Sequence, residues 1–347
     1  MEGTDVVTIA EVADHAGVST STVSYVLSGK RRISFPTAER VRRSIAELGY
    51  RPNARAAALA SRRANAIALV TPLRPDNNVP VLMQFVAAAA MAARVRNHDV
   101  LLITQEEGVA GLERVSGSSL VDAVIVMDVE IADRRIPMLT TLEIPAVMIG
   151  HPGRSQGIST IDLDMAAAAE LAVQHLAELG HRTIAMLGSP SAVYERKSSY
   201  AFRFREGFER ARSGLALEGF WYPVEPSYQS TLEVLRQHFA QHPETTGLIV
   251  HNESILGDVL AVLADEGLRV PEDVSLVALC PSGLAVNQRV ALTSIAVPTD
   301  EIGAAAVDMV LGLVDGTAHP ESRLITPVLT VRSSTANPRP PAETRTP

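Results

Sequence analysis

A helix–turn–helix pattern near the start of the chain constrains the fold more than any other feature of the sequence. Thr8 is a residue type that caps helix N-termini, and apolar residues recur at helical spacing over residues 9–16. Gly17 tolerates the left-handed backbone of a tight turn, and Ser19 can cap a second helix in which Val23 faces inward. The pattern predicts two short helices joined by a tight turn.

Small hydroxyl side chains lie at the N-terminal end of the second predicted helix. In a helix–turn–helix this end enters the DNA major groove, where short polar side chains reach base edges and phosphates. We therefore predict DNA contacts from Thr20, Ser21, Thr22 and Ser24. The alternative is a surface helical hairpin in which these side chains are only solvated.

A third helix and a short Ala-rich segment follow the second helix. Pro36 can open the third helix and Gly49 can end it. Residues 53–63 are too few to form a stable helix in water by themselves. We expect this segment to become helical only when the chain binds DNA.

Head and hinge together resemble the lactose-repressor (LacI/GalR) family, on the motifs Thr8-Ile9-Ala10-Glu11-Val12-Ala13 and Arg51-Pro52-Asn53. In that family the hinge helix folds when two chains meet on DNA, and it inserts a leucine into the minor groove. The further predicted DNA contacts are Thr8, Tyr25, Arg31, Asn53, Arg55 and Leu59, of which Leu59 matches the inserted leucine. The alternative for Leu59 is packing on its own domain.

One position in the head departs from the family pattern. Tyr25 stands where many members carry an arginine that reads a base. A phenol donates one hydrogen bond and cannot form the bidentate contact of a guanidinium with guanine. The departure concerns which base is read and leaves the prediction of DNA binding in place.

Charge is distributed unevenly along the 347 residues. Residues 1–63 contain ten Lys or Arg and six Asp or Glu, a net charge of +4; because the whole chain carries −8, the remainder carries −12. Arginines in the basic segment, among them Arg31 and Arg55, would neutralise phosphates and make binding weaken with salt. The alternative is an ordinary solvated surface.

Several classes of protein are excluded by what the sequence lacks. The single cysteine cannot form an internal disulfide, and no apolar run approaches the length of about twenty residues that a membrane span needs. The N-terminus has neither the basic start nor the apolar run of a secretory signal. We expect a soluble, cytoplasmic protein associated with the bacterial nucleoid and no membrane partner.

From residue 66 onward buried strands alternate with helices, which is typical of a parallel sheet covered on both faces. Two such sets predict two lobes, and the same family has a two-lobed core akin to periplasmic sugar-binding proteins. The predicted fold is therefore α/β, with an all-α head. The predicted segments are a head (1–52), a hinge (53–63), an N-lobe (64–161 and 292–320), a C-lobe (162–291 and 321–332) and a disordered tail (333–347).

Residues that bind a small-molecule effector are expected where strands end in the cleft between the lobes. Asp162 is a candidate acceptor for sugar hydroxyls, whereas Asp164 is better explained as the cap of the helix that follows. Arg203 and Asn252 lie near family positions that contact the effector, with Arg205 a solvated alternative to Arg203 and a turn residue the alternative for Asn252.

The remaining predicted effector contacts are Leu73, Asn77 and Cys280. Cys280 and Gly150 replace aspartates that grip sugar hydroxyls in the family, so the effector is either a sugar held differently or a non-sugar molecule. An aromatic run, residues 220–222, could stack on a sugar ring or simply pack on the surface.

No motif for phosphate binding, acyl transfer or metal hydrolysis is found, so we predict no enzyme activity, cofactor or metal. His175, Glu178 and His181 do not share one helix face, because Gly180 ends the helix. The tail lacks the heptads of a tetramerising helix, and the expected assembly is a homodimer on a pseudo-palindromic operator.

The sequence thus predicts a ligand-regulated DNA-binding repressor of carbohydrate genes, released from or recruited to its operator by the effector. The alternative is a two-lobed binding protein or enzyme that no longer acts on DNA.

Overall fold

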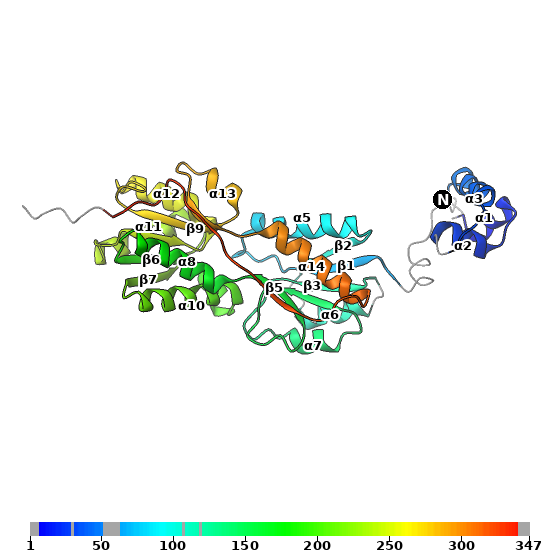
Figure 1. Cartoon of the computed structure of the whole chain (residues 1–347), viewed down its shortest axis with the longest axis horizontal. Helices are drawn as coiled ribbons and strands as arrows, with labels where there is room; N and C mark the ends of the chain where they lie inside the picture. Colours follow the sequence, from blue (N-terminus) through cyan, green and yellow to red (C-terminus); the bar gives the residue numbers. More distant parts are fainter. Residues whose placement is uncertain (1–6, 29–30, 51–62, 106–107, 118–119, 339–347) are drawn as a thin grey trace, which may run out of the picture. The chain divides into compact units, whose positions relative to one another are not determined.

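The computed structural model describes residues 7–28, 31–50, 63–105, 108–117 and 120–338, and these form two compact units that divide between residues 64 and 65. The described residues of the smaller unit form three helices around one small core (Figure 1). They are α1 (Ile9–Ala16), α2 (Thr20–Ser28) and α3 (Phe35–Leu48). Val12, Val23 and Val41 are fully buried at their centre.

Local sequence signals set the ends of these helices. The Thr8 hydroxyl accepts from the Glu11 N–H, and the Glu11 carboxylate accepts from the Thr8 N–H, so the two form a capping box. Gly17 and Gly49 end α1 and α3 with φ of 64° and 63°, a left-handed backbone that suits glycine. The predicted helix–turn–helix and third helix are confirmed.

The larger unit has two lobes, each built on a six-stranded sheet (Figure 1). The first sheet is parallel throughout, in the order β11-β5-β4-β3-β1-β2. Its strands are β1 (Ala66–Val70), β2 (Asp99–Ile103), β3 (Ala123–Val126), β4 (Ala146–Ile149), β5 (Ser159–Leu163) and β11 (Ser322–Ile325). Helices α5 (Val79–Val95) and α14 (Thr299–Val314) pack on one face, and α6 (Gly108–Ser116) and α7 (Ile136–Thr141) pack on the other.

The second sheet has the order β12-β10-β9-β8-β6-β7, and only β12 is antiparallel to its neighbour. Its strands are β6 (Thr183–Gly188), β7 (Glu218–Pro223), β8 (Gly247–Val250), β9 (Ser275–Cys280), β10 (Thr293–Ala296) and β12 (Leu329–Thr330). One face carries α8 (Met165–Glu178) and α10 (Ser199–Gly214), and the other carries α11 (Tyr228–Gln241) and α12 (Leu256–Asp265). Three short helices lie at strand ends: α9 (Ser191–Glu195), η1 (Glu253–Ile255) and α13 (Ser282–Val286).

Fully buried apolar strands explain both sheets, since β3, β4, β6, β8 and β9 are buried along their whole length. The predicted α/β two-lobed core with a helical head is confirmed. Two strands nevertheless lie in the sheet opposite to the one predicted. β10, predicted in the N-lobe, pairs with β9, and β11, predicted in the C-lobe, pairs with β5. An apolar run identifies a strand, but its partner depends on the path of the chain.

The prediction of a disordered tail is wrong for its first residues. The Thr293 N–H donates to the Ser334 hydroxyl over 2.7 Å, that hydroxyl donates to the Leu276 carbonyl, and Ser334 is fully buried. Ala336 exchanges hydrogen bonds with the Ser275 hydroxyl. These bonds attach the chain to β9 and β10 without any apolar pattern. Residues 339–347 lie outside the described part of the chain.

Candidate functional site

The exposed end of α2 is the first candidate site. Thr20, Ser21 and Ser24 are exposed, while Thr22 is half-buried and its hydroxyl lies 3.0 Å from that of Ser19. Ser19 also accepts from the Thr22 N–H over 3.3 Å, which satisfies one of the free donors at the start of the helix. Thr20, Ser21 and Ser24 are therefore free of the cap and available to a ligand.

Two other predicted DNA contacts lie together. The guanidinium of Arg31 is 5.8 Å from the centre of the Tyr25 ring, within the range of a cation–π contact. This contact places a cation beside the phenol that replaces the family's arginine. Thr8 is engaged in the capping box, and Asn53, Arg55 and Leu59 lie outside the described residues.

Between the two lobes lies a cavity of about 170 Å³, which we call the inter-lobe cavity. Three residues predicted to contact an effector line it: Asn77, Asp162 and Asn252. The lining also includes Leu82, Phe85 and Tyr200. The cavity thus combines apolar walls with a few polar groups, as small-molecule sites do.

The two asparagines are held in place by the backbone. Asn77 donates to the Pro72 carbonyl over 2.9 Å, and Asn252 donates to the Val224 carbonyl over 2.9 Å. The Asn252 side chain also accepts from the Ser254 N–H, so it stabilises the turn into η1 while lining the cavity. The turn role weighed in the sequence is therefore present.

Asp162 lies at the end of β5 and is 6 % exposed. One carboxylate oxygen accepts from the Leu163 N–H over 2.9 Å, and the His151 backbone also donates to this carboxyl group. The Oδ2 atom has no partner of normal hydrogen-bond geometry among the described residues. Burial raises the pKa of Asp162 to about 7, against an opposing effect of Arg203. Asp164, by contrast, caps α8 by accepting from the Ala167 N–H.

Leu73, Arg203 and Cys280 do not line the inter-lobe cavity. Leu73 is exposed, and Arg203 is half-buried with one terminal nitrogen that lacks a partner among the described residues. Cys280 packs in the core beneath α11 and α12, where burial raises the pKa of its thiol to about 12. Cysteine is among the most frequently buried residue types, which explains its place in the core.

Sequence reasoning missed Asp128 and Glu253, which also line the cavity. Asp128 follows β3 closely and Glu253 follows β8, so both stand where parallel strands end. Burial raises the pKa of Glu253 to about 7, against a hydrogen bond from Asn78 that lowers it. His251 in the same wall stacks on Phe204, and burial lowers its pKa to about 3, which keeps the ring neutral.

A second cavity of about 640 Å³ adjoins the first at Asp128. Its lining includes Arg74, Asp133 and Arg135, and the charges are paired: Arg74 with Asp128, and Arg135 with Asp133 over 2.6 Å. Paired side chains of this kind present both donors and acceptors to hydroxyl groups.

The aromatic run at 220–222 lines neither cavity. Trp221 packs on Tyr194 and lies 4.6 Å beneath the Arg205 guanidinium, while Phe220 stacks on His242. The surface-packing alternative therefore describes these residues.

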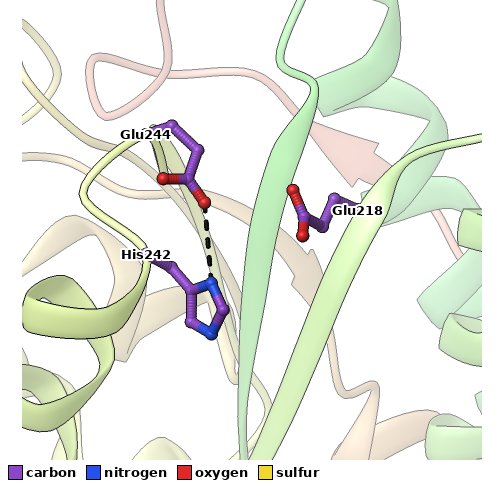
Figure 2. Close-up of side chains that lie close together, drawn as sticks. All are labelled: Glu218, His242 and Glu244. Carbon is purple, nitrogen blue, oxygen red and sulfur yellow. Dashed lines mark ion pairs between the residues drawn. The ribbon is translucent and has the colours of Figure 1, made fainter.

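One cluster outside the cavities brings possible metal ligands together (Figure 2). Glu218 on β7, His242 after α11 and Glu244 offer ligand atoms within 4.8 Å of one another. His242 and Glu244 are 3.6 Å apart, and both glutamates are exposed. Because both glutamates are already solvated, nothing in the cluster requires a cation.

Comparison with known proteins relates both units to described families. Residues 8–53 match the model of bacterial regulatory proteins of the lacI family, and residues 173–335 match a periplasmic binding protein-like domain. The transcriptional regulator CelR of Thermobifida fusca is 30% identical over 94% of this chain and 98% of its own length. Catabolite control protein A of Priestia megaterium is 27% identical over 87% and 90%.

Solved structures agree over nearly the whole chain. A lac repressor dimer bound to operator and the anti-inducer ONPF has a TM-score of 0.83 at 25% identity and covers 95% of this chain and 99% of its own. A complex of the regulator CelR with cellobiose has a TM-score of 0.67 at 27% identity, with coverages of 94% and 99%.

Proposed function

The chain belongs to the LacI family of bacterial regulatory proteins, and on that premise we propose that it is a DNA-binding repressor whose operator affinity is set by a sugar in the inter-lobe cavity. One observation carries the proposal: a single chain contains both parts of such a regulator. It has a helix–turn–helix with exposed hydroxyl side chains, and it has a two-lobed core with a cavity between the lobes. Relatives with both parts include a regulator solved with cellobiose and a repressor dimer solved on its operator.

Exposed apolar side chains support assembly as a homodimer. Met91 and Val95 lie one turn apart on α5 and are 71% and 80% exposed, and Leu101 and Leu102 lie on the neighbouring edge strand β2. Unpaired apolar edges favour association with another chain, and pairing two copies would cover them. A two-fold dimer would present two heads to a pseudo-palindromic operator.

The coupling we propose is between two ligands of one two-state core. Sugar binding between the lobes favours one lobe arrangement, and operator binding favours the other. Sugar therefore weakens the affinity for operator, and operator weakens the affinity for sugar by the same factor. The hinge, residues 53–63, would transmit the change to the heads, with Leu59 inserted in the minor groove.

We also infer that the chain is not an enzyme and works on the chromosome in the bacterial cytoplasm. Its lone cysteine is buried with a raised thiol pKa, so it is a poor nucleophile. The relatives named above are regulators. No helix within the described residues is long and apolar enough to cross a membrane.

DNA selection tests the proposed function. Genomic fragments retained by the purified full chain at near-physiological salt are sequenced. We expect a short palindrome beside genes for sugar transport or breakdown, bound at least about a thousandfold more tightly than unrelated DNA. If no site is enriched with or without added sugars, the proposal is contradicted, and a binding protein without DNA function becomes the better description.

A further inference from the structure

Among the described residues that line the inter-lobe cavity, none is a lysine or arginine and four carry a carboxyl group: Asp76, Asp128, Asp162 and Glu253. Two of these are neutralised by arginines outside the lining. Asp76 pairs with Arg196 over 2.6 Å, and Asp128 pairs with Arg74; all four of these side chains are at most 15% exposed. The pairs leave Asp162 and Glu253 as the two acids in the wall for which no ion pair is found among the described residues.

Asp162 is the group that a ligand would satisfy. It is more than nine-tenths buried, and its Oδ2 atom lacks a partner of normal hydrogen-bond geometry within the described chain. Leaving such an oxygen unpaired costs free energy, and a donor from a ligand removes that cost. Arg203 acts on Asp162 electrostatically, but it does not line the cavity and forms no ion pair with Asp162 in the described structure.

Electrostatics indicate that the hydrogen-bond donor of the ligand is positively charged. Burial raises the pKa of both Asp162 and Glu253 to about 7, so the cavity wall disfavours their ionised forms. A ligand cation would favour the ionised carboxylates and would add Coulomb attraction to the hydrogen bond. A neutral hydroxyl can also donate to a carboxylate, but it carries no charge that would oppose the effect of burial.

Size and shape narrow the ligand further. A volume of about 170 Å³ holds on the order of ten water-sized atoms, close to one hexose ring with its substituents. Phe85 and Tyr200 are aromatic residues in the cavity wall, and aromatic rings can pack against the apolar face of a sugar ring. Asn77 and Asn252 add amide groups that suit hydroxyls.

We propose that the effector is an amino sugar whose ammonium group is bound by Asp162, with Glu253 as the second carboxylate of the pocket. This inference rests on the proposed function, because it names the chemical class of the effector in the same cavity. The hydroxyls of the ring would contact the asparagines, and the larger adjoining cavity leaves room for a second sugar unit beyond Asp128.

The test compares three sugars that differ at one position: D-glucosamine, D-glucose and N-acetyl-D-glucosamine. Their affinities for the full chain are measured by isothermal titration calorimetry at pH 7. We expect D-glucosamine to bind at least about tenfold more tightly than either neutral sugar, and Asp162→Asn to abolish that preference. Asp164→Asn is the matched control, since it removes the same charge two residues away while an asparagine still caps α8.

Glu253→Gln provides a second variant should Asp162→Asn fail to fold, and we expect it to reduce the preference as well. Three results would overturn the inference. A neutral sugar could bind as tightly as D-glucosamine, or D-glucosamine could fail to bind at concentrations on the order of 10 mM. Asp162→Asn could also reduce the affinity for all three sugars equally. Operator affinity measured in the same samples separates the two proposals. If a neutral sugar binds and releases the DNA, the amino-sugar inference is overturned but the proposed regulator function stands. If D-glucosamine binds without any effect on DNA affinity, the amino-sugar inference stands but the proposed regulator function is contradicted.

Discussion

At the scale of single residues, His238 shows how a buried ionisable group ties stability to pH. Its ring is 1% exposed and lies between the Tyr222 hydroxyl at 3.0 Å and the Thr245 hydroxyl at 2.9 Å. Burial lowers the pKa of His238 to about 4, and the neighbouring His242 ring acts in the same direction. In the unfolded chain the same histidine binds a proton near its ordinary pKa of 6.5.

We predict that His238→Gln makes stability less sensitive to acid. Between pH 6.5 and about 4 the unfolded chain takes up a proton that the folded chain refuses, so the contribution of His238 is present above pH 6.5 and is lost as pH falls. The midpoint of thermal unfolding at pH 7 and pH 4.5 measures this. His319→Gln changes an exposed histidine and should keep the wild-type slope. An unchanged slope in His238→Gln would refute the assignment.

Only some of the residues that line the inter-lobe cavity could be predicted from the sequence. Asn77, Asp162 and Asn252 lie in the wall; Asp162 is near the end of β5 and Asn252 follows β8, as the rule for parallel sheets requires. Cys280 also ends a strand, but its side chain points into the core. Whether a strand-end side chain faces the cavity or the core depends on the pleat and on the opposite lobe, which the sequence pattern does not contain.

At the scale of elements, the approach of α8 and α10 is set by one glycine. A Cβ on Gly207 would lie 2.2 Å from the Ala166 carbonyl oxygen, so the helix backbones meet where no side chain fits. Around this point Ala168, Ala169 and Phe208 are buried in the same core. The helices were predicted from their apolar period, but their distance was not, because it depends on both surfaces together.

We predict that Gly207→Ala lowers the free energy of unfolding by about 1–3 kcal/mol, the usual range for overpacking. The measurement is chemical denaturation of the purified chain. Gly214→Ala, at the exposed end of α10, is the matched control: a Cβ there meets nothing within 4 Å, and the change should be neutral or stabilising by up to about 1 kcal/mol. Equal stabilities for the two variants would contradict this account of the helix contact.

At the scale of the whole molecule, the sequence pattern predicted the two lobes but not the pairing of two strands or the position of the tail. Strand and helix alternation gave the two lobes, but β10 and β11 each pair in the other lobe and Ser334 is buried against β9. The chain therefore passes between the lobes after β5, after β10 and after β11. Such long-range pairing leaves no signature in local composition.

The apolar surface of α5 leads to a prediction about assembly. Met91→Glu combined with Val95→Glu should convert the dimer into monomers at micromolar concentration, because the charges would be buried at the interface we propose. Size-exclusion chromatography with light scattering measures the mass. Leu215→Glu alters an exposed leucine after α10, away from α5, and should leave the dimer intact. A dimeric double variant would place the interface elsewhere.

Coupling between cavity and operator is the central claim, and operator affinity with and without sugar tests it most directly. The full chain is titrated with the selected palindrome, by fluorescence anisotropy at fixed salt, alone and with saturating D-glucosamine, D-glucose or cellobiose. We predict that at least one of these sugars changes operator affinity about fivefold or more, the lower end of usual allosteric coupling, and that affinity for unrelated DNA stays the same. Operator affinity that stays constant while a sugar occupies the cavity would contradict the account.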